Sequence, residues 1–130
     1  MERRTRQREA IRAAIVVAGR PLAPQEILSA ALPDVPGLGI ATVYRALKDL
    51  AGSGEIVAVE LPGSTVRYEA AGHGHHHHFH CRRCSRVFEV DGCVAGVEAL
   101  APAGFSVASH EILLYGECAD CSAGTKRRRR

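Results

Sequence analysis

Residues 39–69 read GIATVYRALKDLAGSGEIVAVELPGSTVRYE, and this stretch decides the fold of the N-terminal half. Apolar residues recur with the spacing of one face of an α-helix, at Ile40, Val43, Leu47 and Leu50. The sequence Gly52-Ser53-Gly54 ends this helix. Two β-like runs follow over residues 56–61 and 65–69, joined by Pro62-Gly63-Ser64. The stretch therefore predicts a helix that leads into a β-hairpin.

Two further helices are predicted before this stretch. Residues 5–18 repeat apolar positions with a helical period, with Thr5 as N-cap, and Gly19-Arg20-Pro21 ends the helix. Pro24 suits the first turn of a second helix, and the proline- and glycine-rich residues 33–39 form the loop that follows. Three helices and then a hairpin is the element order of a winged helix-turn-helix domain.

The third predicted helix has a polar face formed by Tyr44, Arg45 and Lys48. This is either an ordinary solvated face or the face that enters the major groove of DNA. The arginines within residues 3–8 favour the second interpretation, because neutralising phosphates requires such charge. The candidate DNA-binding residues are Arg3, Arg6, Arg8, Thr42, Tyr44, Arg45 and Lys48.

The charge is unevenly distributed along the chain of 130 residues, of which 46% are hydrophobic and 24% charged. The net charge is +3, yet residues 9–125 contain 8 Lys and Arg against 13 Asp and Glu, so the positive charge lies in the tails. No apolar run reaches the roughly 18 residues of a membrane span, and no signal-peptide core follows Arg8. We therefore expect a soluble, cytoplasmic protein.

Four of the five cysteines form two Cys-x-x-Cys pairs, Cys81/Cys84 and Cys118/Cys121. In a reducing cytosol such pairs are metal ligands more often than disulfides. A two-residue turn lets both sulfurs reach one ion at about 2.3 Å, and two such turns complete a tetrahedral shell with no open position. The pairs predict a structural Zn²⁺ site. The alternatives are a redox pair or unpaired buried cysteines.

Six of the seven histidines lie within residues 73–80. Imidazole binds zinc, iron, nickel and copper alike, so the tract does not choose a metal, and a solvated polar loop is the alternative. If residues 75–80 are extended, alternate side chains face opposite ways. One face then carries His76, His78 and His80, and the other carries His75 and His77. One strand can thus serve two sites.

The remainder predicts a strand over residues 86–90, a short helix over residues 93–101 and a longer β-like run over residues 105–115. Two domains of about 65 residues are each marginal without a metal or a partner. We therefore expect this half to rely on zinc and on strands that pair with a second subunit across a two-fold axis.

The predicted fold class is α+β, with a winged helix-turn-helix DNA-binding domain over residues 1–70. A small α/β metal-binding dimerisation domain with a four-cysteine structural zinc follows over residues 71–121. We expect a disordered basic tail over residues 122–130.

Five stretches carry a family resemblance by their order and spacing. They are Thr5-Arg-Gln-Arg8, GIATVYRAL over residues 39–47, HHHHFHCRRC over residues 75–84, Ser109-His110, and LYGECADC over residues 114–121. Together they resemble the ferric uptake regulator family of bacterial metal-dependent transcription factors, across residues 3–121.

The resemblance implies a homodimer that binds a palindromic A·T-rich operator in double-stranded DNA. Tyr44 and Arg45 match family residues that contact a thymine methyl and the DNA backbone, and Arg3 matches a basic residue that reaches into the minor groove. A regulatory metal between the domains would act as corepressor, because an ion that binds one arrangement better stabilises it by its differential affinity.

The resemblance also implies an interdomain metal site. Its family ligands are a carboxylate at the end of the wing and two alternate histidines, matched here by Glu69, His76 and His78, together with a histidine from the second helix region. That fourth position falls near Pro21, which has no ligating side chain. The site is therefore incomplete, or completed by another residue or water.

A second regulatory ligand group in the family contains a histidine, an aspartate, a glutamate and a histidine. His75 and His110 match the two histidines, and His77 replaces the aspartate. Either Cys93 or Glu98 falls at the glutamate position; the alternative for Cys93 is a small buried hydrophobe. With Cys93 the set is softer than usual, which favours Zn²⁺ over Fe²⁺ as the second metal.

The sequence thus favours a zinc-responsive repressor of metal-uptake genes, with an iron-responsive regulator as the alternative. A peroxide sensor is less expected because residue 77 is not aspartate, and nickel and manganese stay open. A metal-dependent hydrolase would need an open coordination position and a general base, for which Glu69 is the one proposal, but no H-E-x-x-H pattern is present. A metal storage or delivery protein would have no use for Arg45 and a basic arm.

Overall fold

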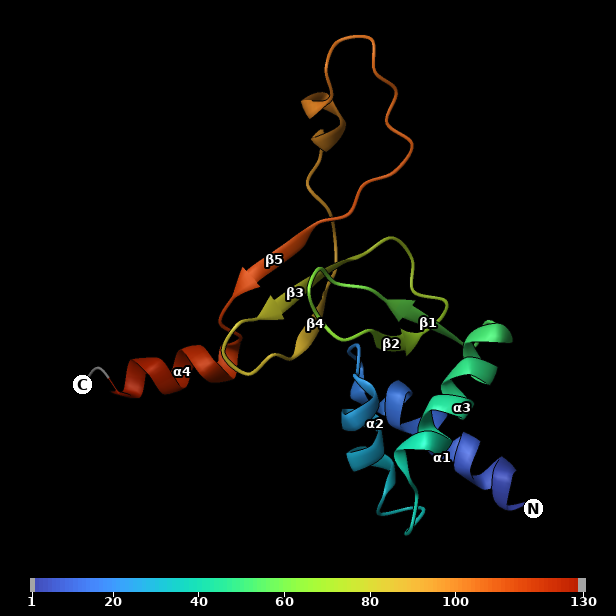
Figure 1. Cartoon of the computed structure of the whole chain (residues 1–130). Helices are drawn as coiled ribbons and strands as arrows, with labels where there is room; N and C mark the ends of the chain where they lie inside the picture. The colour runs from blue at the N-terminus through green and yellow to red at the C-terminus, as the bar shows by residue number, and fades with distance from the viewer. Residues whose placement is uncertain (1, 129–130) are drawn as a thin grey trace. The chain divides into compact units, whose positions relative to one another are not determined.

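The structure, a computed structural model, describes residues 2–128, and its contacts divide the chain after His73 into two compact units. The first unit contains three helices and a hairpin (Figure 1). Its elements are α1 (Arg3–Ala18), α2 (Pro24–Ala31), α3 (Ile40–Gly52), β1 (Ile56–Val59) and β2 (Arg67–Ala70). The predicted element order of a winged helix-turn-helix is confirmed.

The hairpin is tied to the helices by a short additional pairing. β1 and β2 pair antiparallel, with Ile56 opposite Ala70. The backbone of Leu22, between α1 and α2, exchanges two hydrogen bonds of 2.9 Å with Tyr68 on β2. The segment between α1 and α2 is therefore fixed to β2 by these two hydrogen bonds.

The three helices pack their apolar faces around one core. Each fully buried Ile or Leu contributes about 1.5–3 kcal/mol relative to an exposed one, so the first unit has a substantial core of its own. The core residues are Ile11, Ile15, Leu22, Ile27, Ala31, Leu38, Val43, Ala46, Leu47, Leu50 and Ile56.

The helix ends differ from the expectation at one position. Thr5 lies inside α1 and not at its N-cap, because the N–H of Arg6 already donates to the carbonyl of Glu2 at 3.0 Å. Gly19 ends α1 in the left-handed conformation, with φ of 63°. Pro24 opens α2 as predicted, and Glu26 accepts a hydrogen bond of 2.9 Å from the N–H of Ala23.

The second unit is built on a three-stranded sheet in the order β4-β3-β5. β3 (His77–Cys81) pairs antiparallel with β4 (Val87–Val90) and parallel with β5 (Leu113–Gly116). Among the described residues, this unit buries only His77, Cys81, Val87 and Cys118. Two of the four are cysteines of the Cys-x-x-Cys pairs, so the apolar core is as small as the sequence predicted.

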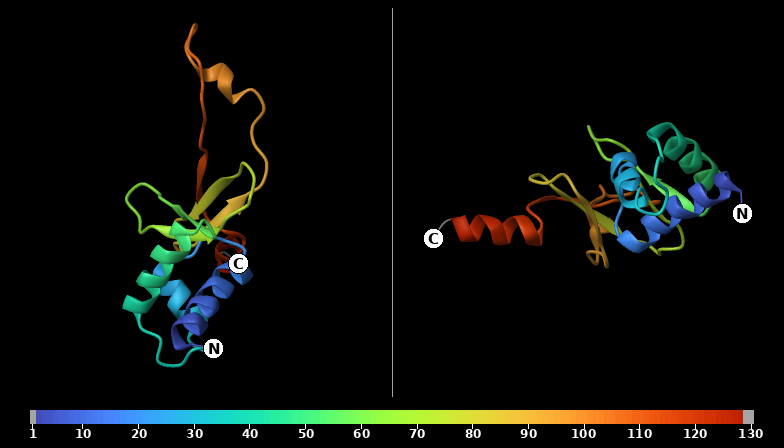
Figure 2. Two further views of the ribbon diagram at one scale, coloured as in Figure 1. Left: turned by 90° about the vertical axis from the view of Figure 1, so that its right-hand side faces the viewer. Right: turned by 90° about the horizontal axis from the view of Figure 1, so that it is seen from below.

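The segment between β4 and β5 is more irregular than predicted. It extends from the sheet as a long loop that contains one short 3₁₀ helix, η1 (Val97–Leu100), instead of a helix over 93–101 (Figure 2). The β-like run over 105–115 forms a strand only from Leu113. Its apolar side chains are not packed into a core of the described residues, since Leu100 and Phe105 are 85% and 70% exposed.

The C-terminal end also departs from the expectation. A helix, α4 (Ala119–Arg128), follows Cys118 directly, where a disordered tail was predicted from residue 122. The N–H of Ser122 donates to the carbonyl of Cys118 at 2.8 Å, so the second cysteine pair starts the first helical turn. Residues 129–130 lie outside the described residues. No helix in the described part of the chain is long and apolar enough to cross a bilayer.

Candidate metal centres and nucleic-acid interface

The four paired cysteines meet in one cluster in the second unit. Cys81 ends β3, Cys84 follows in the turn to β4, and Cys118 and Cys121 flank the start of α4. The sulfur of Cys81 lies 3.8 Å from that of Cys121, and the sulfur of Cys84 lies 3.8 Å from that of Cys118. Each distance therefore joins one cysteine pair to the other.

This cluster fits a tetrahedral Zn²⁺. Zn–S bonds of about 2.3 Å at the corners of a tetrahedron place the sulfurs about 3.8 Å apart. The Cys81–Cys121 and Cys84–Cys118 sulfur–sulfur distances both have this value. A four-thiolate shell leaves no open coordination position, so an ion here would support the fold and not react with a substrate.

The backbone stabilises the thiolate form of Cys81. Burial opposes ionisation, but the N–H groups of Cys84 and Cys118 donate to this sulfur at 3.4 and 3.3 Å and lower its pKa to about 6. The pKa of Cys121 is instead raised to about 12, by burial and by the neighbouring cysteine sulfurs. A metal ligand must be a thiolate, so only a cation can hold all four sulfurs in that form.

Arg86 is a cationic neighbour of the cluster that the sequence did not reveal. Its guanidinium donates to the sulfur of Cys84 at 3.2 Å, to the sulfur of Cys118 at 3.6 Å and to the carboxylate of Asp120 at 3.2 Å. Hydrogen bonds to Cys84 and Asp120 raise the pKa of Arg86. Only the fold reveals that Arg86 also reaches the second cysteine pair, because Arg86 lies 32 residues before Cys118.

A second cluster contains three imidazoles and one thiol. His75, His77, Cys93 and His110 place one ligand atom each within 4.8 Å of one another. The sulfur of Cys93 lies 2.9 Å from Nε2 of His110 and 3.2 Å from Nε2 of His77. Nε2 of His75 lies 3.2 Å from Nε2 of His110.

Of the two alternatives at the glutamate position, Cys93 lies in the cluster. Glu98, on η1, lies outside it and approaches the other ring nitrogen of His110, with Oε1 3.9 Å from Nδ1. A carboxylate near Nδ1 favours a proton on that nitrogen and leaves Nε2 available as a ligand.

His77 is the buried member of this cluster. Burial lowers its pKa, and the nearby His75 and His110 lower it further, so the ring is neutral as metal binding requires. The N–H of Ile112 donates to Nδ1 of His77 at 3.0 Å, which orients Nε2 towards Cys93. This contact places the proton of the neutral ring on Nε2. A metal bound at Nε2 would therefore require the other tautomer, with the proton on Nδ1 and this hydrogen bond broken.

The donor set fits a divalent ion of intermediate softness. Zn–N bonds of about 2.0–2.1 Å give a nitrogen–nitrogen edge of about 3.3 Å, close to the 3.2 Å between His75 and His110. The sulfur–nitrogen edge would be about 3.5 Å, so Cys93 must draw back by a few tenths of an ångström. Three imidazoles with a thiolate suit Zn²⁺ better than Fe²⁺.

The proposed interdomain ligands lie in both units. Glu69 lies on β2 of the first unit and is buried, and Pro21 is buried as well. In the second unit the rings of His76 and His78 lie edge to face with centroids 5.0 Å apart, and Nδ1 of His76 lies 2.7 Å from the carbonyl oxygen of Gly74. Their common metal site stays a prediction.

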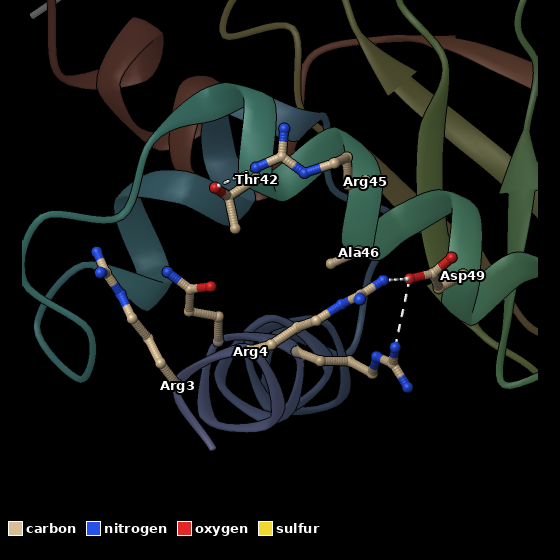
Figure 3. A pocket seen from close by; sticks show the side chains of 8 residues that line it. Arg3, Arg4, Thr42, Arg45, Ala46 and Asp49 are labelled. Carbon is tan, nitrogen blue, oxygen red and sulfur yellow. Dashed lines mark hydrogen bonds and ion pairs between the residues drawn. The ribbon is translucent and has the colours of Figure 1, made fainter.

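The candidate DNA-binding residues lie on α1 and α3. A groove of about 460 Å³ is lined by Arg3, Arg4, Gln7, Arg8, Thr42, Arg45, Ala46 and Asp49 (Figure 3). Four predicted residues are among them, namely Arg3, Arg8, Thr42 and Arg45. The other three predicted residues, Arg6, Tyr44 and Lys48, are exposed but do not line it.

The groove also contains residues that the sequence analysis missed. Arg4 and Gln7 lie one helical turn from Arg8 and Arg3, so the helical spacing of α1 is a signal that reveals them. Asp49 lies one turn after Arg45 on α3. The groove therefore combines four guanidiniums with a single carboxylate.

Known proteins similar to this chain match most of its length. The model of the Ferric uptake regulator family matches residues 2–115. The zinc uptake regulation protein of Mycobacterium tuberculosis is 32% identical over 122 residues, covering 92% of this chain and 94% of that protein. The ferric uptake regulation protein of Campylobacter jejuni is 29% identical over 124 residues, covering 91% and 78%.

A solved structure agrees with the fold. The ferric uptake regulator of Francisella tularensis, determined with iron, superposes with a TM-score of 0.70 at 26% identity, covering 94% of this chain and 93% of that one. Because the family model matches most of the sequence, and the helices and hairpin of the first unit follow the predicted order, this chain belongs to the Ferric uptake regulator family.

Proposed function

We propose that this protein is a metal-responsive DNA-binding repressor in which Zn²⁺ is the corepressor for control of metal-uptake genes. The observation that carries the proposal is the cluster of His75, His77, Cys93 and His110. It is a second group of metal-ligating side chains in a chain whose four-cysteine cluster already fits a structural ion.

The choice of zinc rests on Cys93. Thiolate and imidazole ligands favour Zn²⁺, whereas Fe²⁺ sites are richer in carboxylates. The one nearby carboxylate, on Glu98, faces Nδ1 of His110 and not the centre of the cluster. An iron-responsive regulator is the second candidate, since a relative named for ferric uptake matches the chain over a similar length.

The DNA-binding role rests on the first unit. Tyr44 is 53% exposed on α3, the helix that a winged helix-turn-helix inserts into the major groove, and Arg45 lines the adjacent arginine-rich groove. We propose that Arg3 reaches into the minor groove of an A·T-rich site and that the operator is palindromic. These roles follow the family resemblance of the α1 and α3 sequences.

A palindromic operator requires two copies of the chain. The exposed apolar side chains of the second unit, Val94, Leu100 and Phe105, give a second subunit a surface to cover. We therefore propose a homodimer formed through this unit. A metal that binds the DNA-competent arrangement of the dimer better than the others would raise its population.

Fluorescence anisotropy with a palindromic A·T-rich duplex tests the proposal. The full chain is first treated with a chelator, then titrated with Zn²⁺, and in a parallel anaerobic series with Fe²⁺. We expect zinc to restore binding at lower free concentration than iron. Binding that is equally tight with and without metal would contradict the corepressor role, and a response to Fe²⁺ alone would favour the iron-responsive candidate.

Arg45→Ala separates the two halves of the proposal. This variant should lose DNA affinity while it retains both metal equivalents, because Arg45 lies in the first unit, outside both clusters. A storage or delivery protein would show neither duplex binding nor any effect of this substitution.

A further inference from the structure

The arginine-lined groove of the first unit contains one residue that opposes its proposed partner. Its walls come from the N-terminal half of α1 and from α3, and four of its eight lining residues are arginines (Figure 3). Asp49 supplies the only carboxylate among the lining residues. A phosphate that enters this groove therefore meets four cations and one anion.

The carboxylate of Asp49 already binds two of these cations. Its Oδ2 lies 3.3 Å from a guanidinium nitrogen of Arg8, which donates a hydrogen bond, and 3.7 Å from one of Arg4. Figure 3 shows two guanidiniums joined to Asp49 by dashed lines. Arg45 is held differently, because its guanidinium donates to the hydroxyl of Thr42 at 3.0 Å.

All three partners remain accessible to a ligand. The side chains of Asp49, Arg8 and Arg4 are 42%, 44% and 79% exposed. Exposed ion pairs contribute little to stability, so exchanging one anionic partner for another costs little folding energy. A phosphodiester oxygen can accept the same hydrogen bonds that Asp49 accepts.

We propose that Asp49 is an internal competitor for DNA phosphates, which lowers the affinity of a single winged-helix unit for any duplex. This inference rests on the proposed DNA-binding function of the same face. Displacing the carboxylate from Arg4 and Arg8 reduces the gain from each phosphate contact, and the carboxylate that stays nearby repels the phosphate.

A weak single unit makes binding depend on two units that engage together. When two modules are linked in the right geometry, the second contact becomes intramolecular and the combined affinity rises steeply. Low affinity per unit keeps one-sided binding rare, so the dimer arrangement that places both units on the operator decides occupancy. Asp49 would thus strengthen the dependence of DNA binding on the corepressor.

Asp49→Asn removes the charge and nearly conserves the shape. Anisotropy with a random-sequence duplex, in the presence of chelator and over a series of salt concentrations, should show affinity raised about three- to tenfold at low salt. The slope of log affinity against log salt should steepen by about 1, because one more cation becomes available to release a counterion.

Two further variants isolate the cause. Asp91→Asn makes the same chemical change at an exposed position of the second unit, and should leave the affinity unchanged. In an Arg4→Gln/Arg8→Gln background, Asp49→Asn should add no more than twofold, because the cations for which it competes are absent. Thermal unfolding confirms that each variant is folded.

If the wild-type protein binds duplex, two results would overturn this inference and leave the proposed function standing. One is DNA affinity of Asp49→Asn that is unchanged or lower; the other is an equal rise in DNA affinity in Asp91→Asn. A folded wild-type protein that binds no duplex, with or without Zn²⁺, would overturn the proposed function and this inference with it.

Discussion

The sulfur of Cys93 lies 2.9 Å from Nε2 of His110, although 17 residues separate them in the sequence. This contact distinguishes Cys93 from Glu98, which reaches only the opposite nitrogen of the same ring. It assigns the thiol to the ligand cluster and the carboxylate to a supporting position beside it.

Cys93→Ser is therefore expected to lower the affinity of the second metal equivalent by at least a hundredfold, because a thiolate ligand is lost. Glu98→Gln should lower it by about tenfold, the lower end of the range typical of a residue that orients a ligand. Elemental analysis and competition with a chromophoric chelator measure both. Equal losses in the two variants would argue that Cys93 is not a ligand.

An ion in the four-cysteine cluster should stabilise the second unit. Cys118→Ser removes one thiolate, and few of the described residues of this unit are buried, so the variant should lose the first metal equivalent and unfold at a lower urea concentration. Far-ultraviolet circular dichroism with metal analysis measures this. Cys93→Ser is the matched control, and it should retain the structural ion.

Arg86 should slow the loss of zinc from that cluster. Its guanidinium donates to sulfurs of both cysteine pairs, which offsets the charge of four thiolates. In competition with a chelator, Arg86→Gln is expected to retain zinc about tenfold more weakly than the wild type. Zinc retention by Arg86→Lys should lie between that of Arg86→Gln and that of the wild type. Arg83→Gln, on the same turn but paired with Glu117, is the control and should behave as wild type.

The pKa of Cys81 predicts a pH dependence of stability. Its folded value of about 6 lies below the 9.0 of a free thiol, so this thiolate stabilises the fold fully above pH 9. That contribution is lost as the pH falls from 9 through 6. With chelator present, the urea midpoint should rise between pH 6 and pH 9. The urea midpoint of Cys81→Ser should rise less over the same pH range. An identical rise would show that the Cys81 thiolate is not the cause.

Arg8 and Arg6 form a matched pair for DNA binding. Both are arginines on α1, but only Arg8 lines the groove with Arg45. Arg8→Gln should weaken binding to any duplex and reduce the salt slope by about 1, whereas Arg6→Gln should have a smaller effect. Anisotropy at several salt concentrations tests this. A larger loss of DNA affinity in Arg6→Gln than in Arg8→Gln would indicate that the phosphate contacts lie outside the groove, on another face of α1.

Local patterns were sufficient for most elements. The apolar spacing in α1, α2 and α3, the break at Gly19 and the proline at position 24 are signals carried by neighbouring residues, and the structure follows them. The segment over 93–115 was predicted less well, because its β-like and helix-like residues do not pack into a core in the part of the chain that the structure describes.

The sequence by itself determined the winged-helix element order and the two cysteine pairs, because helical periodicity and Cys-x-x-Cys turns act over a few residues. Only the tertiary structure placed Cys93 and not Glu98 in the histidine cluster, brought Arg86 to the sulfur of Cys118 and placed Asp49 against Arg4 and Arg8. These contacts join residues 12 to 45 positions apart. Such contacts depend on how strands and helices pack, and no local periodicity encodes them.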